Sequence, residues 1–176
     1  MYINREKINK IADTIREALE LIIPPYDPSD AIKKLDGKIL YDVFDNDIDA
    51  FIEKREDLFV LHLNPQKPNS RERFSIAHEL GHLFLHMGYL IDQDKWKSFE
   101  SRFTDSILFR SDNYSSIEYE ANEFAAAFLM PKEEFIIVAE ENLDENLYYI
   151  ESIAKYFQVS TLAASNRGKW LGLFEW

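Results

Sequence analysis

Cysteine is absent from this 176-residue chain. Its absence excludes disulfide bonds and thiolate zinc sites, so any metal ion must be held by histidine and carboxylate side chains. The chain also lacks an apolar run near the length of about 18 residues that a membrane helix needs, and its first residues lack the apolar stretch of a signal peptide. These absences predict a cytoplasmic protein with no membrane partner.

Basic residues are scarce, with 20 Lys and Arg against 32 Asp and Glu, for a formal net charge of −12. They form no run longer than Lys33-Lys34, and such a chain repels the phosphate backbones of nucleic acids. We therefore expect no direct nucleic-acid binding. In the simplest interpretation the acidic surface serves solubility. In a more specific one it attracts a basic partner protein.

Histidine is also rare, with four in the chain, yet two of them fall in an H-E-x-x-H pattern at His78, Glu79 and His82. Four residues advance a helix by about 400°, so the two imidazoles project from nearly the same face one turn apart. That spacing lets both bind one zinc ion. Glu79 lies beside them, where it can take the proton of a zinc-bound water and pass it to the leaving amine. The alternative, incidental polar residues on an exposed helix face, explains the spacing less well.

A catalytic zinc site needs a third protein ligand, and a predicted helix downstream carries several carboxylates. Glu118 is the candidate ligand, the alternative being an ordinary surface carboxylate. Asn122, one turn away, would accept a hydrogen bond from the free ring nitrogen of a ligand histidine. Glu120 and Glu123 point elsewhere by helical geometry, so we expect them in solvent. Gly81, within the motif helix, costs about 1 kcal/mol relative to alanine, which indicates close approach of another backbone.

Two blocks of the sequence resemble the ImmA/IrrE family of bacterial metallopeptidases. The first is A-H-E-L-G-H at residues 77–82, and the second is E-x-x-A-N-x-F-A-x-x-x-L-M-P at residues 118–131. The resemblance covers most of residues 28–173 and implies a single-zinc endopeptidase with Glu118 as the third ligand. Members of the family act on helix-turn-helix repressors that control mobile elements or stress genes. With no sensor domain after residue 176, the chain resembles the minimal form found beside phage and conjugative-element repressors.

Other polar side chains are candidates for supporting roles. His86 continues the face of the motif histidines but lies about 12 Å along the helix axis from His78. We therefore expect it to pack or to hydrogen-bond a ligand rather than to bind the metal. His62, on a predicted strand, is expected to be a satisfied polar residue. A donor that stabilises the oxyanion should exist, and the sequence offers four candidates: Tyr114, Tyr119, Arg71 and Arg73.

The expected fold is α+β, with a small twisted β-sheet packed on a zincin-like H-E-x-x-H helix and a helical C-terminal portion. We expect a metallopeptidase domain at residues 1–131 and a helical subdomain at 132–176, either separate or integral to one domain. A long loop at 88–115 is a candidate cleft wall, and the apolar strand 58–63 is a candidate exposed edge for substrate. The predicted elements are helices at 4–22, 29–35, 68–87, 116–129, 145–157 and 161–171, and strands at 38–44, 50–54 and 58–63.

The leading hypothesis is a cytoplasmic zinc endopeptidase that hydrolyses a peptide bond in a basic, DNA-binding helix-turn-helix repressor, with one zinc ion per chain. One alternative is a zinc-containing binding module that sequesters its partner without proteolysis. Another is a toxin–antitoxin component built on the same fold. A structural zinc would usually close its fourth position with a protein ligand, so the intact H-E-x-x-H favours the enzyme. Two histidines and a carboxylate also accept manganese or iron.

Overall fold

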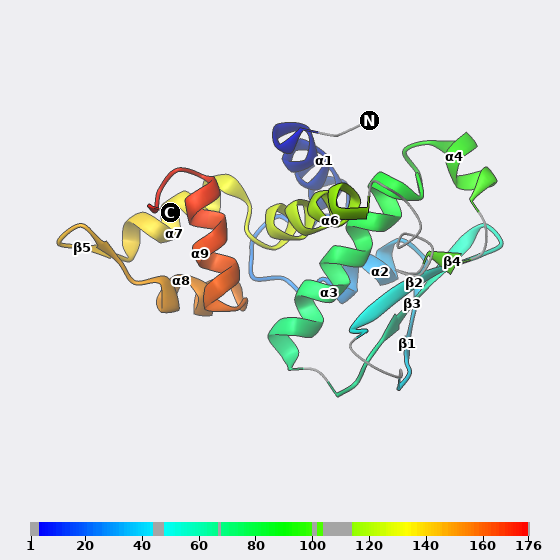
Figure 1. The fold of residues 1–176 in the computed structure, drawn as a ribbon, viewed down its shortest axis with the longest axis horizontal. Helices are drawn as coiled ribbons and strands as arrows, with labels where there is room; N and C mark the ends of the chain where they lie inside the picture. Colours follow the sequence, from blue (N-terminus) through cyan, green and yellow to red (C-terminus); the bar gives the residue numbers. More distant parts are fainter. Residues whose placement is uncertain (1–3, 44–47, 67, 100–101, 104–113, 176) are drawn as a thin grey trace.

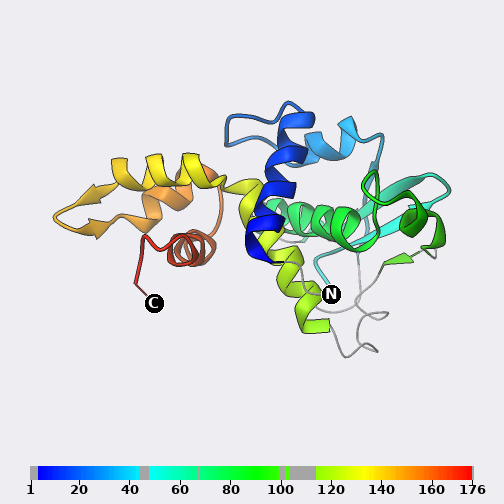
Figure 2. The same ribbon diagram turned by 90° about the horizontal axis from the view of Figure 1, so that it is seen from above.

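The computed structural model describes residues 4–43, 48–66, 68–99, 102–103 and 114–175. A small sheet lies at one end of the molecule and the C-terminal helices lie at the other, with the long helices α3 (Asn69–Gly81) and α6 (Tyr114–Leu129) between them (Figures 1 and 2). The expected α+β class is confirmed. Within the described ranges, no helix combines the length and apolar character needed to span a membrane. The remaining helices are α1 (Arg5–Ala18), α2 (Ser29–Lys34), α4 (Gln93–Ser98), α7 (Lys132–Glu141), α8 (Ile150–Phe157) and α9 (Thr161–Trp170).

Within the described ranges, the sheet has four strands in the order β1 (Lys38–Tyr41), β3 (Leu58–Leu63), β2 (Ala50–Arg55) and β4 (Arg102–Phe103). Strand β3 runs parallel to β1 and antiparallel to β2, with Ile52 opposite Leu61. Its continuous apolar run reflects this central position, because every β3 residue except Leu58 is buried. The expectation that β3 forms an exposed edge is therefore wrong. Strand β2 lies nearer the edge, where β4 pairs with it at Ile52 and Glu53.

Helices α3 and α6 pack closely because small residues meet at their crossing. A β-carbon on Gly81 would lie 3.0 Å from the Cα atom of Ala121, closer than side chains normally approach a backbone. The close approach expected at Gly81 is confirmed. Leu80 and Phe124, both fully buried, fill the core beside this crossing. Beyond Gly81 the helix continues through a π-turn, η1 (His82–His86), in which the Met87 amide donates to the His82 carbonyl at 2.9 Å.

The C-terminal portion combines α7, α8 and α9 with a short hairpin, β5 (Leu143–Asp144) and β6 (Leu147–Tyr148). The helix expected at 145–157 begins only at Ile150. Glu145 and Asn146 adopt positive φ angles of 45° and 68°, which suits a two-residue hairpin turn and which asparagine tolerates well. The rings of Phe135 and Phe157 stack with centroids 5.5 Å apart and hold α7 against α8.

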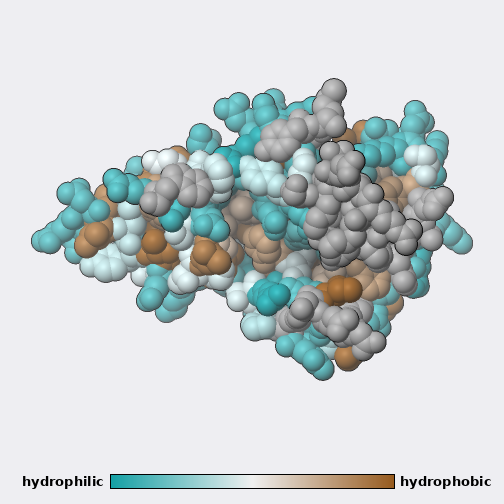
Figure 3. All heavy atoms as spheres, viewed as in Figure 1, coloured by the Kyte–Doolittle hydropathy of each residue, from teal (hydrophilic) through white to brown (hydrophobic). Residues whose placement is uncertain are grey.

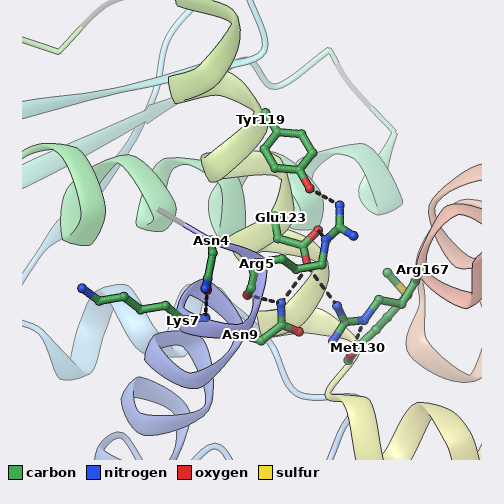
Figure 4. A network of polar contacts seen from close by, with 8 residues as sticks. All are labelled: Asn4, Arg5, Lys7, Asn9, Tyr119, Glu123, Met130 and Arg167. Atoms are coloured by element: carbon green, nitrogen blue, oxygen red, sulfur yellow. Dashed lines mark hydrogen bonds and ion pairs between the residues drawn. The ribbon is translucent and has the colours of Figure 1, made fainter. Parts of the chain in front are cut away.

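Helix α9 is joined to α6 by a buried ionic network (Figure 4). The Arg167 guanidinium is 2% exposed; its Nε donates to the Met130 carbonyl at 3.0 Å, and its Nη1 lies 3.3 Å from Glu123 Oε1. Glu123 also accepts hydrogen bonds from Arg5 and Asn9 of α1. The expectation that Glu123 lies in solvent is wrong, because α1 and α9 cover it from both sides. A domain boundary near residue 131 stays a prediction.

Candidate metal centre

Three side chains from α3, η1 and α6 converge on one point. The Nε2 atoms of His78 and His82 lie 2.9 Å apart. Across the helix interface, the carboxylate oxygens of Glu118 lie 3.2 Å from His78 Nε2 and 3.3 Å from His82 Nε2. One ligand atom from each residue falls within 4.8 Å of the others. The helical repeat aligns the two histidines, and the close contact of α3 with α6 brings Glu118 to them.

These atoms fit a divalent cation. Two ligands at 2.0–2.1 Å from a tetrahedral zinc ion are about 3.3 Å apart, close to the distances observed between Glu118 and the imidazoles. Glu118 Oε1 is also buried without a hydrogen-bond partner among the described residues. A buried carboxylate oxygen left in this state is costly unless a cation or donor compensates it. The donor set of two imidazoles and one carboxylate is one that zinc accepts in catalytic sites.

The outer nitrogens of both histidines are oriented by further hydrogen bonds. His78 Nδ1 lies 3.1 Å from Asn122 Oδ1, the contact expected from the sequence. His82 Nδ1 lies 2.9 Å from His86 Nδ1, and His86 Nε2 lies 3.2 Å from Glu120 Oε2. A single set of tautomers satisfies these three contacts: each motif histidine donates from Nδ1 and leaves the lone pair of Nε2 free to bind a cation, while His86 accepts from His82 and donates to Glu120.

Glu120 is the supporting residue that sequence reasoning missed. It is 4% exposed, so the expectation that it lies in solvent is wrong. Glu120 and Glu118 are two positions apart on α6 and point in different directions, but the π-turn places His86 where it can reach Glu120. Such π-turns widen a helix locally and are frequent at functional sites. The available signal was His86 itself, because a histidine that accepts a hydrogen bond from His82 needs an acceptor for its own ring N–H.

Burial and neighbouring charges shift the pKa values of the side chains at the site in different directions. Burial lowers the pKa of His82 to about 3 and that of His86 to about 3, so both rings are neutral near pH 7. Burial also acts to lower the pKa of His78, but the Glu118 and Glu79 carboxylates and the hydrogen bond to Asn122 together outweigh burial and raise that pKa above its ordinary value. Burial acts to raise the pKa of Glu118, yet the two imidazoles hold it well below its usual range. Metal binding would therefore compete with a proton on His78.

Two of the three converging residues, His78 and Glu118, line a cleft of about 230 Å³ between α3, α6 and the start of β2, whereas His82 is buried. Glu79 lines this cleft beside His78 and is 7% exposed. Asp49 and Ala50 form the opposite wall. A water or a peptide carbonyl held near the three ligand atoms would therefore face the Glu79 carboxylate.

Three of the four proposed oxyanion donors have described side chains, and none of these three lines the cleft. Tyr114 begins α6, and its side chain lies outside the described residues. The hydroxyl of Tyr119 accepts from Arg5 on the side of α6 that faces α1. Arg71 is exposed and pairs with Asp49 at the outer rim. Arg73 is buried elsewhere, and burial lowers its pKa.

His62 makes the satisfied contacts expected of it. Its ring stacks on Phe51 with centroids 4.3 Å apart. Its two nitrogens lie 2.5 Å from Asp42 Oδ2 and 3.3 Å from Glu53 Oε2. The His62 cluster belongs to the sheet, and His62 is absent from the group of described residues that could hold a metal ion.

A helix bearing H-E-x-x-H, a glutamate from a second helix and a small flanking sheet define the architecture of an H-E-x-x-H peptidase. The family model described as the IrrE N-terminal-like domain, a peptidase family, matches residues 33–169. The chain belongs to this family, so the resemblance seen in the sequence is confirmed. Membership indicates a peptidase role in a family that depends on zinc in general.

Comparison with individual proteins shows which known fold the chain shares. No curated protein matches the chain. Among solved structures, a Mycobacterium tuberculosis transcriptional regulator is similar, with a TM-score of 0.62 and 19% sequence identity. The match covers 94% of this chain and 46% of the regulator, so this chain spans less than half the length of that protein. At this identity the likeness shows a shared fold.

Proposed function

We propose that the protein is a zinc-dependent endopeptidase that cleaves a DNA-binding repressor, with His78, His82 and Glu118 as metal ligands and Glu79 as the general base. The observation that carries the proposal is the convergence of the three ligand atoms within 4.8 Å, beside a buried glutamate. The family match supports the peptidase class. A DNA-binding substrate would place the reaction in the cytoplasm.

A zinc ion at this site would supply a Lewis acid that lowers the pKa of a water and polarises the scissile carbonyl. The chain's own side chains would orient the metal ligands and transfer the proton. Asn122 and the His86–Glu120 pair hold the two imidazoles in the tautomer that directs Nε2 to the site. The Glu79 carboxylate accepts the proton of the attacking water and then donates it to the leaving amine. Its position between the two histidines on one helix fixes its distance from them.

Charge and strand geometry support the choice of substrate. The net charge of −12 suits a basic partner such as a DNA-binding protein, and electrostatic attraction would raise the association rate. Residues 48–50, which precede and begin β2, border the cleft. An extended substrate segment could add to this side of the sheet through its backbone. The experiment therefore uses a basic helix-turn-helix repressor as the candidate substrate.

The test combines metal analysis with cleavage. Glu79→Gln should retain zinc and lose cleavage of the repressor, with a fall of at least about 100-fold. His82→Ala should lose the metal, while Glu140→Gln, an exposed control on α7, should behave as the parent does. Fragments detected by mass spectrometry that disappear with a chelator indicate the enzyme. A stable complex without fragments would instead support the sequestering module, and unchanged cleavage by Glu79→Gln would refute the mechanism.

A further inference from the structure

A second pocket lies next to the metal cleft. It has a volume of about 410 Å³ and is formed by α3, α6 and α9. Phe74 and Asn122 line both spaces, and Asn122 at the same time holds the His78 ring. Figure 3 shows a hollow with apolar side chains between the C-terminal helices and the α3–α6 pair. The pocket therefore adjoins the cleft in which the peptide bond would lie, with Phe74 and Asn122 as shared walls.

The walls of this pocket are mostly apolar. Leu162 and Trp170 of α9 line it and are 69% and 45% exposed, so large apolar side chains stand open to solvent here. Phe74, Ala126 and Ala163 complete the apolar lining, and all three are half-buried. Volume and lining match those of pockets that bind ligands, which are typically about 300–1,000 Å³ and largely hydrophobic.

The charged groups in its wall, Glu123 and Arg167, pair with each other, and the one nitrogen of Arg167 without a hydrogen-bond partner among the described residues, Nη2, is buried from solvent. Glu123 lies 2.9 Å from Arg5 Nε, 2.7 Å from Asn9 Nδ2 and 3.3 Å from Arg167 Nη1 (Figure 4). The Arg5 guanidinium also lies 3.5 Å above the Trp170 ring, which fixes the outer wall by a cation–π contact. A charged ligand group would find these partners engaged and would lose its hydration on entry. An apolar group would lose nothing of this kind.

We propose that this pocket binds a large apolar side chain of the substrate, such as Phe, Leu or Met, within a few residues of the scissile bond. The proposal rests on the proposed peptidase function and adds a determinant of substrate choice. Helix α9, far from the metal ligands in sequence, is then a specificity element of the active site. The substrate needs an apolar anchor in an accessible segment, in addition to a basic surface.

The test uses four tripeptide hydroxamates, which carry a metal-binding group: one contains only alanine, and each of the others has a single phenylalanine at one of the three positions. Affinities for the zinc-loaded protein are measured by calorimetry. One of the three phenylalanine compounds should bind about 10- to 100-fold more tightly than the all-alanine compound. Leu162→Asp should abolish that gain. Leu147→Asp should preserve it, because Leu147 is equally exposed (71%) but lies on the β6 strand away from the pocket.

A second readout does not depend on the metal. N-acetyl-phenylalaninamide at millimolar concentration should shift the indole NMR signal of Trp170 in the parent and in Leu147→Asp, but not in Leu162→Asp. Equal affinity for all four hydroxamates, or a Trp170 signal that does not respond, overturns the proposed pocket. Failure of every hydroxamate to bind while the Trp170 signal still responds counts against the metallopeptidase function and leaves the pocket supported.

Discussion

Glu120 provides a sharp test of the site because it acts on the metal only through His86. Replacing Glu120 with glutamine keeps the size and an acceptor oxygen but removes the negative charge beneath His86. His86 would then be a weaker acceptor for the hydrogen bond from His82, and the Nε2 lone pair of His82 would become a weaker ligand. The side chain is 4% exposed, so water cannot take over the lost contact.

The expected magnitude follows from the contact. Glu120 Oε2 lies 3.2 Å from His86 Nε2. A hydrogen bond to a charged group is worth about 1.5–3 kcal/mol, whereas a neutral one is worth about 0.5–1.5 kcal/mol. The charge therefore contributes about 1–1.5 kcal/mol, or about a 10-fold change in zinc affinity. Mutations of such supporting partners typically cost 10- to 100-fold in metal affinity, and His86→Phe, which removes the whole pair, should fall at the upper end.

Zinc affinity would be measured by competition with a chromophoric chelator at pH 7.5. Glu151→Gln, an exposed glutamate on α8, is the matched control and should bind zinc as the parent does. Urea unfolding of the metal-free proteins separates a loss of affinity from a loss of fold. A zinc affinity of Glu120→Gln within twofold of the parent, with the fold intact, would refute the proposed role of the His86–Glu120 pair.

Two further predictions concern stability. Gly81→Ala should destabilise the protein by about 1–3 kcal/mol, measured by urea unfolding, although alanine has the better helix propensity. The reason is that the new methyl group would lie 3.0 Å from the Ala121 backbone. A stabilised variant would contradict the close packing of α3 on α6. Metal-free protein should lose stability as the pH falls below about 6.5, which is the pKa of a histidine in the unfolded chain. His82 and His86 have folded pKa values of about 3, so below pH 6.5 the unfolded chain binds protons at these two residues that the folded protein does not bind. Among the described histidines with shifted pKa values, His78 is the one whose pKa is raised and which opposes this trend. Unfolding measured at pH 8 and pH 5.5 should still show the loss of stability, and equal stability at both would refute the prediction.

Local periodicity was enough to predict that His78 and His82 lie together on one helix face. The positions of His78 and His82 on one helix face follow from the number of residues per turn, which packing does not alter. Glu118 followed from the same repeat together with the family-like block around it. The glycine at position 81 even indicated where the second helix would approach. These features depend on residues a few positions apart, whose relation is set by the helix itself.

Packing between distant segments decided the rest. Glu120 and Glu123 appear solvated when α6 is considered alone, and they are buried because η1, α1 and α9 pack over them. Strand β3 is central because β1 pairs with its outer side, a parallel contact that no local pattern encodes. The pocket beside the metal cleft exists only because α9 folds back against α6. The sequence by itself determined which residues share a helix face. Only the tertiary structure decided which residues each face contacts, because these contacts join segments that can be more than 100 residues apart.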